Sequence, residues 1–247
     1  MDRLIYSSLA GMRGAMARQT TTASNLANVN TTGFRGEINA AETLWLRGGK
    51  LEARATTSSE VTGANMSAGP VSETGRELDI AMNGDALLAV QAKDGSEGYT
   101  RRGDLQLTDS GLLTTGDGAP VLGEGGPVTL PRADSITISQ DGQIWIVPQG
   151  GDPKAPQAVE KLKLVTAAGS QVAKGLDGLF RVKGEGALPS DPDARLTPKS
   201  LEGSNVNATQ TLVDMIDASR SWEAQVKMLT TAQDLDKSAA DLMRLPD

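Results

Sequence analysis

The sequence predicts a mainly β protein that carries a long α-helix at each end. Apolar residues recur with a helical period over the first and last segments of the 247-residue chain. Short β-prone runs, separated by Gly, Pro and Asp, lie between these two segments. The predicted organisation is an N-terminal helix at 1–30, a connector at 31–75, an all-β domain at 76–200 and a C-terminal helix at 201–247.

The N-terminal helix is predicted from a heptad stripe, in which the residues of one face recur at alternating steps of four and three. The stripe consists of Ile5, Leu9, Met12, Met16, Gln19, Ala23 and Leu26, and all but Gln19 are apolar. Gly11 and Gly14 interrupt it, and each weakens an isolated helix by about 1 kcal/mol. We therefore expect this helix to become ordered only when it packs against a partner.

The connector is rich in Thr, Ser, Gly and Ala and has no clear period, which indicates an extended or hairpin-like segment. In the central domain, turn signals such as Asp94-Gly95 and Asp141-Gly142 separate the β-prone runs at hairpin distances. The candidate strands are Leu87–Val90, Leu105–Leu107, Val128–Leu130, Ile136–Ile138, Ile144–Val147, Leu162–Val165 and Leu179–Val182.

The C-terminal helix shows the same alternation over a longer stretch. Its stripe consists of Leu212, Met215, Ser219, Trp222, Val226, Leu229, Gln233, Asp236, Ala240 and Met243. Asn207, followed three residues later by Gln210, resembles a capping box, so the helix is predicted to begin near Ala208 and to end before Pro246. Such a helix is about 55 Å long at ~1.5 Å per residue, too long for a domain of this size to cover.

Two arrangements can cover these apolar stripes: a purely internal helical hairpin, or packing against other chains. Because both stripes keep a coiled-coil period and flank an independent β domain, they favour packing between chains in an axial coiled-coil bundle. The predicted subunit-interface residues are Ile5, Leu9, Met12, Met16, Ala23, Leu26, Leu212, Met215, Trp222, Val226, Leu229, Ala240 and Met243.

The composition argues against most enzymes and against nucleic-acid binding. The chain has neither His nor Cys, which removes the commonest general base, the usual zinc ligands and thiol nucleophiles. A net charge of −7 is unsuited to a phosphate-binding surface. No apolar run approaches the ~20 residues needed to span a bilayer, and Arg13 and Arg18 interrupt the N-terminal segment where a secretory signal would be apolar. We expect no cofactor, metal, nucleic acid, membrane insertion or small-molecule substrate.

Carboxylates are the only plentiful catalytic material. The pairs Asp79 with Asp85, and Asp191 with Asp193, could act as acid and base in a hydrolase. Each of these residues stands beside Gly or Pro or in a predicted turn, where Asp is favoured for local backbone bonding. We therefore expect a structural role for them and predict that the protein is not an enzyme.

The run from Ser24 to Arg35, Ser-Asn-Leu-Ala-Asn-Val-Asn-Thr-Thr-Gly-Phe-Arg, resembles the N-terminal signature of the rod and hook proteins of the bacterial flagellum. Leu201–Asn207 resembles the C-terminal motif of the same family, and Leu78–Asp85 and Tyr99–Leu105 resemble the start of its β domain. The motif residues are Asn25, Leu26, Ala27, Asn28, Thr31, Gly33, Phe34, Ser204, Asn205 and Val206. One departure is Ala86-Leu87-Leu88, where the family usually has Gly-Phe-Phe.

The resemblance implies a structural subunit of the basal-body rod, whose terminal helices pack with those of other rod subunits into a shaft that crosses the periplasm and transmits torque. It also implies export through the flagellar type III apparatus without a cleaved signal peptide. Met1–Tyr6 and Trp222–Met228 look most like the proximal-rod branch, with the distal-rod branch as the nearest competitor. From a different class of function, an oligomeric β-rich module that binds glycan or peptide remains an alternative.

Overall fold

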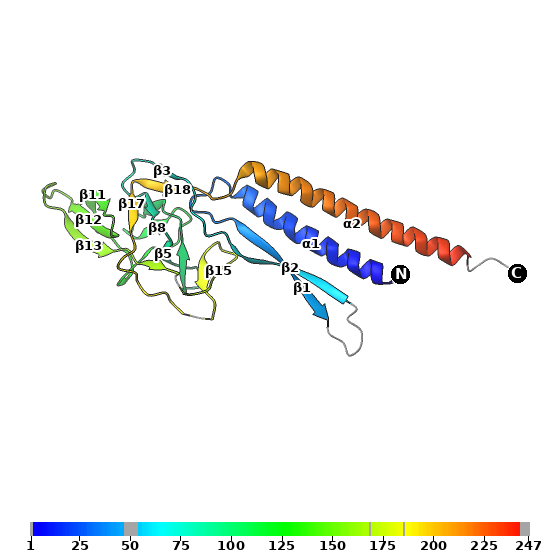
Figure 1. The fold of residues 1–247 in the computed structure, drawn as a ribbon. Coiled ribbons are helices and arrows are strands. Elements are labelled where there is room, and N and C mark those ends of the chain that lie inside the picture. The colour runs from blue at the N-terminus through cyan, green and yellow to red at the C-terminus, as the bar shows by residue number, and fades with distance from the viewer. Residues whose placement is uncertain (1, 47–53, 168, 185, 243–247) are drawn as a thin grey trace. The chain divides into compact units, whose positions relative to one another are not determined.

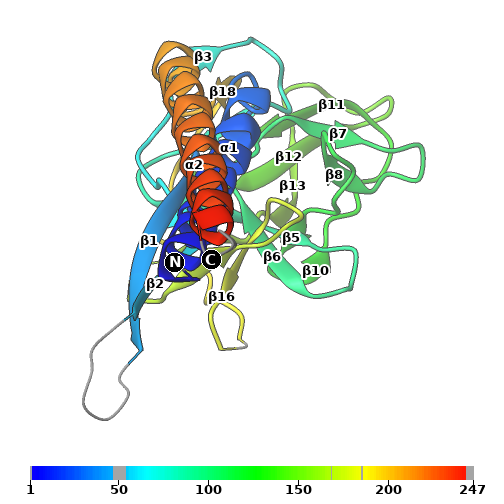
Figure 2. The same cartoon turned by 90° about the vertical axis from the view of Figure 1, so that its right-hand side faces the viewer.

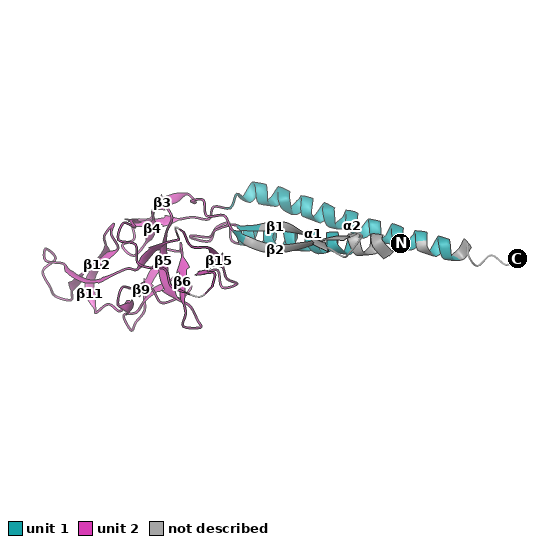
Figure 3. Cartoon of the chain, turned by 60° about the horizontal axis from the view of Figure 1, so that its bottom comes forward, with its two compact units in different colours: residues 1–27, 37–63, 206–247 teal, residues 28–36, 64–205 magenta. Residues whose placement is uncertain are grey.

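The computed structural model describes residues 2–46, 54–167, 169–184 and 186–242. They form two compact units. The helical unit comprises residues 1–27, 37–63 and 206–247, and the β unit comprises 28–36 and 64–205 (Figure 3). The chain is mainly β with two long helices, as predicted (Figure 1). The units do not follow the linear division expected from the sequence, because residues 28–36 belong to the β unit although they directly follow the first helix.

The helical unit contains α1 (Asp2–Ala27), β1 (Glu37–Leu46), β2 (Arg54–Ala64) and α2 (Ala208–Leu242). The strands β1 and β2 form a two-stranded sheet within the stretch that was expected to be an extended or hairpin-like connector. Figure 2 looks along the two helices and shows that the N-terminal end of α1 and the C-terminal end of α2 lie at the same end of the pair. Neither helix, over the residues described, is apolar and long enough to cross a membrane.

Local signals place the start of α2 where the sequence predicts it. Asn207 Oδ1 accepts a hydrogen bond from the backbone N–H of Gln210 at 3.1 Å, which is the bond of an N-cap residue. The Gln210 side chain does not complete a reciprocal capping box with Asn207; it donates to Asp214 at 2.9 Å, one turn further along the helix. The cap therefore rests on Asn207 alone.

The β unit is built from short strands in several small sheets. Its strands are β3 (Val71–Glu73), β4 (Ile80–Met82), β5 (Ala86–Gln91), β6 (Glu97–Thr100), β7 (Leu105–Leu107), β8 (Leu113–Thr115), β9 (Leu122–Gly123), β10 (Gly126–Pro127), β11 (Ala133–Ile138), β12 (Gln143–Pro148), β13 (Gln157–Lys161), β14 (Leu164–Thr166), β15 (Val172–Lys174), β16 (Phe180–Val182), β17 (Leu196–Pro198) and β18 (Ser200–Glu202). The largest sheet has the order β14-β5-β6-β16-β15, and β11-β12-β13 form a second. Smaller pairs are β17-β4, β18-β3, β7-β8 and β10-β9.

Strand β5 is apolar on both faces and lies between two hydrophobic clusters. Leu88 and Val90 point into one hydrophobic cluster, and Leu87 and Ala89 point into the other. All four side chains are fully buried, which explains a continuous apolar run in place of an alternating pattern. The two leucines occupy the positions where the rod and hook family usually has Phe-Phe, and they fill one core each.

Most of the predicted strands match observed ones to within two or three residues. The exception is Val128–Leu130, where only an isolated bridge between Thr129 and Leu112 forms. Val128 and Leu130 are nevertheless buried in the larger cluster. Their apolar character therefore reflects core packing rather than membership of a regular strand.

Candidate assembly surface and buried ion-pair cluster

The two helices of the helical unit pack against each other in antiparallel orientation. Gly11 lies against the side chain of Gln225, and a Cβ atom added at Gly11 would come within 2.9 Å of it. Further along α1, the Arg18 guanidinium reaches Ser221 Oγ at 3.5 Å. Residue numbers thus rise along α1 while they fall along α2. Glycine at position 11 weakens the isolated helix but allows α2 to approach closely.

On α1 the contact stripe is shifted by one residue from the apolar stripe seen in the sequence, and on α2 it is shifted at every second position. On α2 the buried and half-buried residues recur as Thr211, Met215, Ala218, Trp222, Gln225, Leu229 and Ala232. On α1 the corresponding series is Ser8, Gly11, Ala15, Arg18, Thr22 and Asn25, of which Arg18 alone is exposed. The residues that bring the two helices together are therefore mostly small or polar.

Five large apolar residues that follow a contact residue by one position are exposed. Successive residues of a helix turn by about 100°, and in an antiparallel pair the positions one residue after the contact stripe lie on the same side of both helices. Leu9, Met16, Leu212, Ile216 and Val226 occupy such positions and are between 37% and 60% exposed. We call these five residues the apolar side face.

The predicted interface residues divide between the contact stripe and the side face. Met215, Trp222 and Leu229 are half-buried on the contact stripe of α2, while Leu9, Met16, Leu212 and Val226 belong to the side face. Met12, Ala23 and Leu26 are half-buried on α1, and Ala240 is exposed on α2. Ile5 and Met243 lie outside the residues whose side chains are described. Ile216 was not singled out from the sequence, because it does not fit the predicted alternation.

Two apolar residues of α2 lie on the opposite side of the pair from the side face. Met228 and Leu235 are more than half exposed; Met228 stands one position before the contact residue Leu229, and Leu235 lies two helical turns further along the same face. Together with Ala224, Ala232 and Ser8 they line a largely apolar groove of about 670 Å³. The helix pair thus presents uncovered apolar surface on two sides.

The β unit brings the N-terminal and C-terminal family motifs together around a buried ion-pair cluster. Glu202, which is fully buried, receives Arg35 Nη2 at 2.8 Å on one carboxylate oxygen and Arg101 Nη2 at 2.7 Å on the other. Both guanidinium groups are also buried, with about 2% of each residue exposed. We call Arg35, Arg101 and Glu202 the Glu202 cluster.

Backbone groups complete the hydrogen bonding of the Glu202 cluster. The N–H of Gly69 donates to Glu202 Oε1 at 2.8 Å. Arg101 donates to the carbonyl oxygens of Met82, Gly84 and Ala86 at 2.9, 2.7 and 2.6 Å. Burial lowers the pKa of Arg101, and the neighbouring Glu202 carboxylate opposes this shift. Four oxygen atoms, three carbonyl oxygens and Glu202 Oε2, therefore surround a guanidinium group that is almost fully buried.

Gly33 is the motif residue for which only glycine fits. Its φ of 66° lies in the left-handed region, and an added Cβ would come within 2.4 Å of the Arg101 backbone. Its N–H donates to the carbonyl oxygen of Glu202 at 2.7 Å. Beside it, the ring of Phe34 lies under the ammonium group of Lys174, 3.7 Å from the ring centroid.

The polar motif residues make hydrogen bonds that hold neighbouring chain segments together. Asn25 exchanges two hydrogen bonds with the backbone of Glu37, at 2.7 and 3.0 Å, at the end of α1. Thr31 donates from its hydroxyl to Asn28 Oδ1 at 3.1 Å. Asn205 bonds three backbone groups of the β unit, Ser204 is buried, Leu26 and Val206 are half-buried and Ala27 is exposed. The motif residues thus hold chain segments together rather than forming a chemical site.

The aspartates that were weighed as acid–base pairs are engaged locally or exposed. Asp79 is buried, accepts from Thr74 at 2.7 Å and pairs with Arg76 at 3.0 Å, while Asp85 is exposed. Asp191 accepts from the hydroxyl of Thr166, and this bond lowers the pKa of the Asp191 carboxyl. Over the residues that the structure describes, no group of three or more acidic side chains could hold a metal ion.

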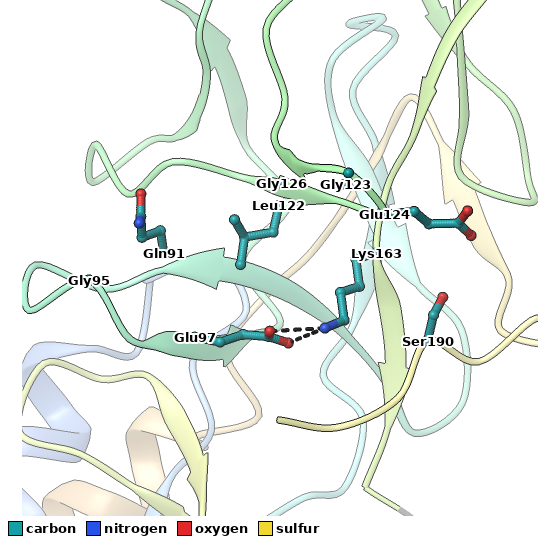
Figure 4. A pocket seen from close by; sticks show the side chains of 10 residues that line it. Gln91, Gly95, Glu97, Leu122, Gly123, Glu124, Gly126, Lys163 and Ser190 are labelled. Carbon is teal, nitrogen blue, oxygen red and sulfur yellow. Dashed lines mark hydrogen bonds and ion pairs between the residues drawn. The ribbon is translucent and has the colours of Figure 1, made fainter. Parts of the chain in front are cut away.

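A pocket of about 610 Å³ also lies in the β unit, and half of its lining residues belong to the β9–β10 hairpin (Figure 4). Two of its charged side chains form an ion pair, because Lys163 Nζ lies 2.7 Å from the Glu97 carboxylate (Figure 4). The other polar side chains that line it are Gln91, Glu124 and Ser190. The paired lysine is not available as a nucleophile, and the pocket does not bring together an acid, a base and a nucleophile.

Three protein-family models match the chain. The model described as "Flagella basal body rod protein" matches residues 5–35, "Flagellar hook protein FlgE/F/G D1 domain" matches 81–146, and "Flagellar basal body rod FlgEFG protein C-terminal" matches 197–242. The first of these matches includes most of α1, and the last includes all of α2. The middle match covers β5 and the first half of the β unit.

Curated relatives match over almost the whole length. The flagellar basal-body rod protein FlgF of Salmonella typhimurium is 39% identical over 251 residues, covering 99% of this chain and 100% of the relative. FlgF of Escherichia coli is 40% identical with the same coverage. The flagellar basal-body rod protein FlgG of Bacillus subtilis is 32% identical over 272 residues, again covering 99% of this chain and 100% of the relative.

Proposed function

Because this chain belongs to the flagellar basal-body rod protein family, we propose that it builds the rod by packing its terminal helices against those of neighbouring subunits. Membership makes it a structural subunit of the bacterial flagellar basal body and not an enzyme. Three properties of the subunit follow from this proposal: the surface through which it assembles, its position in the rod and its route of export.

The observation that carries this proposal is the apolar side face. Leu9, Met16, Leu212, Ile216 and Val226 together expose an apolar strip along one side of the helix pair. Complete burial of a residue of this size is worth about 1.5–3 kcal/mol, and roughly half of that remains to be gained here. Five such residues, together with the groove beside Met228 and Leu235, supply a driving force for association on two sides of the pair.

Two apolar sides favour an open polymer over a closed dimer. A contact between unlike surfaces leaves one of each kind free on every new subunit, so growth continues along an axis. The partners are other rod subunits, of this kind and of related kinds, and the helices form an axial coiled-coil bundle with them. The bundle is the shaft that crosses the periplasm and transmits torque.

The full-length similarity to FlgF proteins supports a position in the proximal rod. A distal-rod position is the alternative, because the FlgG protein of Bacillus subtilis also matches over the whole chain. The subunit reaches the rod through the flagellar type III export apparatus as an unfolded chain without a cleaved signal. In this state α1 is not yet ordered, and it forms when α2 and neighbouring subunits cover it.

The test is complementation of motility in a strain that lacks the gene for this protein. Met16→Glu and Ile216→Glu place a charge on the apolar side face and are expected to abolish swimming, because the carboxylate would be desolvated at the interface. Leu176→Glu serves as the control, since Leu176 is a fully exposed apolar residue in a turn of the β unit. It removes the same kind of surface and is expected to leave swimming unchanged.

Purified, detached rods distinguish failure of assembly from failure of export. Under the proposal, the two side-face variants appear outside the cytoplasm but are missing from the rod. Normal swimming of both variants would remove the side face as the assembly surface.

A further inference from the structure

The β unit is closed by its last strands. β18 pairs with β3 and β17 pairs with β4, so the first two strands of the unit have their ladder partners more than a hundred residues later in the chain. Glu202 stands opposite Val71, and Leu196 stands opposite Met82. Contacts of such long sequence separation form only after the entropy cost of closing a long loop has been met.

The same closing segment supplies the only carboxylate that touches the two buried guanidinium groups, over the residues described. Arg35 and Arg101 reach Glu202 at 2.8 and 2.7 Å. Backbone carbonyl groups also accept from both arginines, at Ser67 for Arg35 and at Gly84 for Arg101. Carbonyl dipoles orient a guanidinium group but do not neutralise it. Without Glu202, two like charges would be buried together.

The arginines cannot easily turn outward to escape this cost. Arg101 makes three bonds to the backbone of residues 82–86, directly at the start of the central strand β5. Arg35 donates to the carbonyl oxygen of Ser67 at 2.7 Å, a group outside the closing segment. Their positions are therefore set by the segments that form the core of the unit.

We propose that Glu202 is a folding latch, so that the β unit attains its closed state only when residues 196–202 have joined Arg35 and Arg101. If the β unit closed before residues 196–202 had joined it, it would have to bury the two positive charges of Arg35 and Arg101 without a counter-charge. The latch concerns folding of the β unit and stands independently of the helix packing proposed above. The latch also gives a physical reason why the β unit would stay unfolded while the chain is exported.

The first test uses the full-length chain and native-state hydrogen exchange. Glu202→Gln keeps the shape of the side chain but removes its charge. Removing one partner of a buried ion pair is expected to speed exchange at least about 100-fold, and to do so at the amides of Leu88 and Tyr99 in β5 and β6 as well as in β18. Glu73→Gln is the matched control, because Glu73 is exposed on the adjacent strand β3.

A triple variant separates the charge effect from simple loss of packing. Arg35→Met, Arg101→Met and Glu202→Leu together replace the cluster with apolar side chains, which is expected to restore slow exchange at Leu88 because no charge is left unpaired. If Glu202→Gln accelerates exchange only in β3 and β18, or if the triple variant exchanges as fast as Glu202→Gln, the latch is refuted.

The timing is tested on ribosome-bound nascent chains of the natural sequence. Chains with residues up to 195 outside the ribosome are expected to be cleaved rapidly by protease within the β unit. Chains with residues up to 207 outside are expected to be protected, and the Glu202→Gln chain of the same length is expected to be cleaved like the short one. Equal protection at the two lengths would overturn the proposal.

Discussion

Asn205 Oδ1 accepts a hydrogen bond from the backbone N–H of Gly36 at 2.8 Å, across a sequence separation of 169 residues. The Nδ2 group of the same side chain donates to the carbonyl oxygens of Asn65 and Ser67 at 2.7 and 2.8 Å. One amide thus ties together three segments of the β unit, each of which stands at or near a point where the chain passes to the helical unit. A carboxylate cannot replace it, because both donor and acceptor are used.

Asn205→Ala is therefore expected to lower the free energy of unfolding by about 1–3 kcal/mol. The groups left behind are partly exposed, so water satisfies some of them. Asn205→Asp keeps the size and the acceptor but loses the donor, and it faces two carbonyl oxygens with a negative charge. It is expected to be at least as unstable as the alanine variant in urea unfolding followed by tryptophan fluorescence. Wild-type stability of Asn205→Asp would contradict this account.

Gly33→Ala is expected to destabilise the β unit by more than the cost of a left-handed backbone alone. That cost is about 1–2 kcal/mol, and the clash with the Arg101 backbone adds to it. Gly118→Ala is the matched control, because Gly118 also has a positive φ, of 86°, but an added Cβ would meet nothing within 4 Å. Urea midpoints of the two variants measure the difference. Equal midpoints would show that the neighbouring backbone moves aside without cost.

Asn207→Ala is expected to remove the N-cap of α2 and to cost about 1 kcal/mol. The loss follows from the Gln210 N–H, which would no longer have the Asn207 side chain as its acceptor. Thermal unfolding followed by circular dichroism at 222 nm reports on the helices. Thr209→Ala, at an exposed position of the first helical turn, is the control and is expected to melt like the wild type. A melting temperature of Asn207→Ala equal to that of the control would rule out the cap.

The stability of the β unit is expected to fall at high pH because of Tyr99. Burial raises the pKa of the Tyr99 hydroxyl above its ordinary value, and the N–H of Leu188 opposes this shift. A raised pKa in the folded state means that the folded chain holds the proton more tightly than the unfolded chain. The stabilisation that this tighter proton binding gives the folded state is fully present below the unfolded pKa of about 10. It is lost as the pH rises through the pKa of Tyr99 in the folded state.

Urea unfolding between pH 8 and pH 11 measures this loss, and Tyr99→Phe is the comparison. The variant lacks the titrating hydroxyl, so its stability is expected to change less over this interval than that of the wild type. It also lacks the bond to Leu188 and is expected to be less stable at neutral pH by about 1 kcal/mol. Parallel pH curves for the two proteins would remove Tyr99 as the cause.

The helices and their ends could be read from the sequence because their signals are local. Asn207 caps the first turn of α2 within three residues, and the heptad period acts over a few turns. The period also indicated that each helix has an apolar face. It could not show which neighbour would cover that face, because a single position separates the small contact residues Ser8 and Ala15 from Leu9 and Met16.

The Glu202 cluster could not be predicted in the same way. Arg35, Arg101 and Glu202 all lie in segments that resemble family motifs, but charged residues at isolated positions usually face solvent. Their pairing spans 101 residues between Arg101 and Glu202, and no local pattern marks it. Gly33, two residues before Arg35, was a local signal of a turn, because glycine is favoured where the backbone needs a positive φ.

Local patterns in the sequence indicate two long terminal helices, a β-rich segment between them in the chain, and the motifs of a flagellar rod protein. Only the folded chain shows that the two end motifs join around one buried carboxylate, and that several large apolar residues of the helix pair remain exposed. The two kinds of feature differ in the range over which their interactions act. Helical period and capping act between residues a few positions apart, whereas burial of charge and of apolar surface depends on partners that only the folded chain brings together.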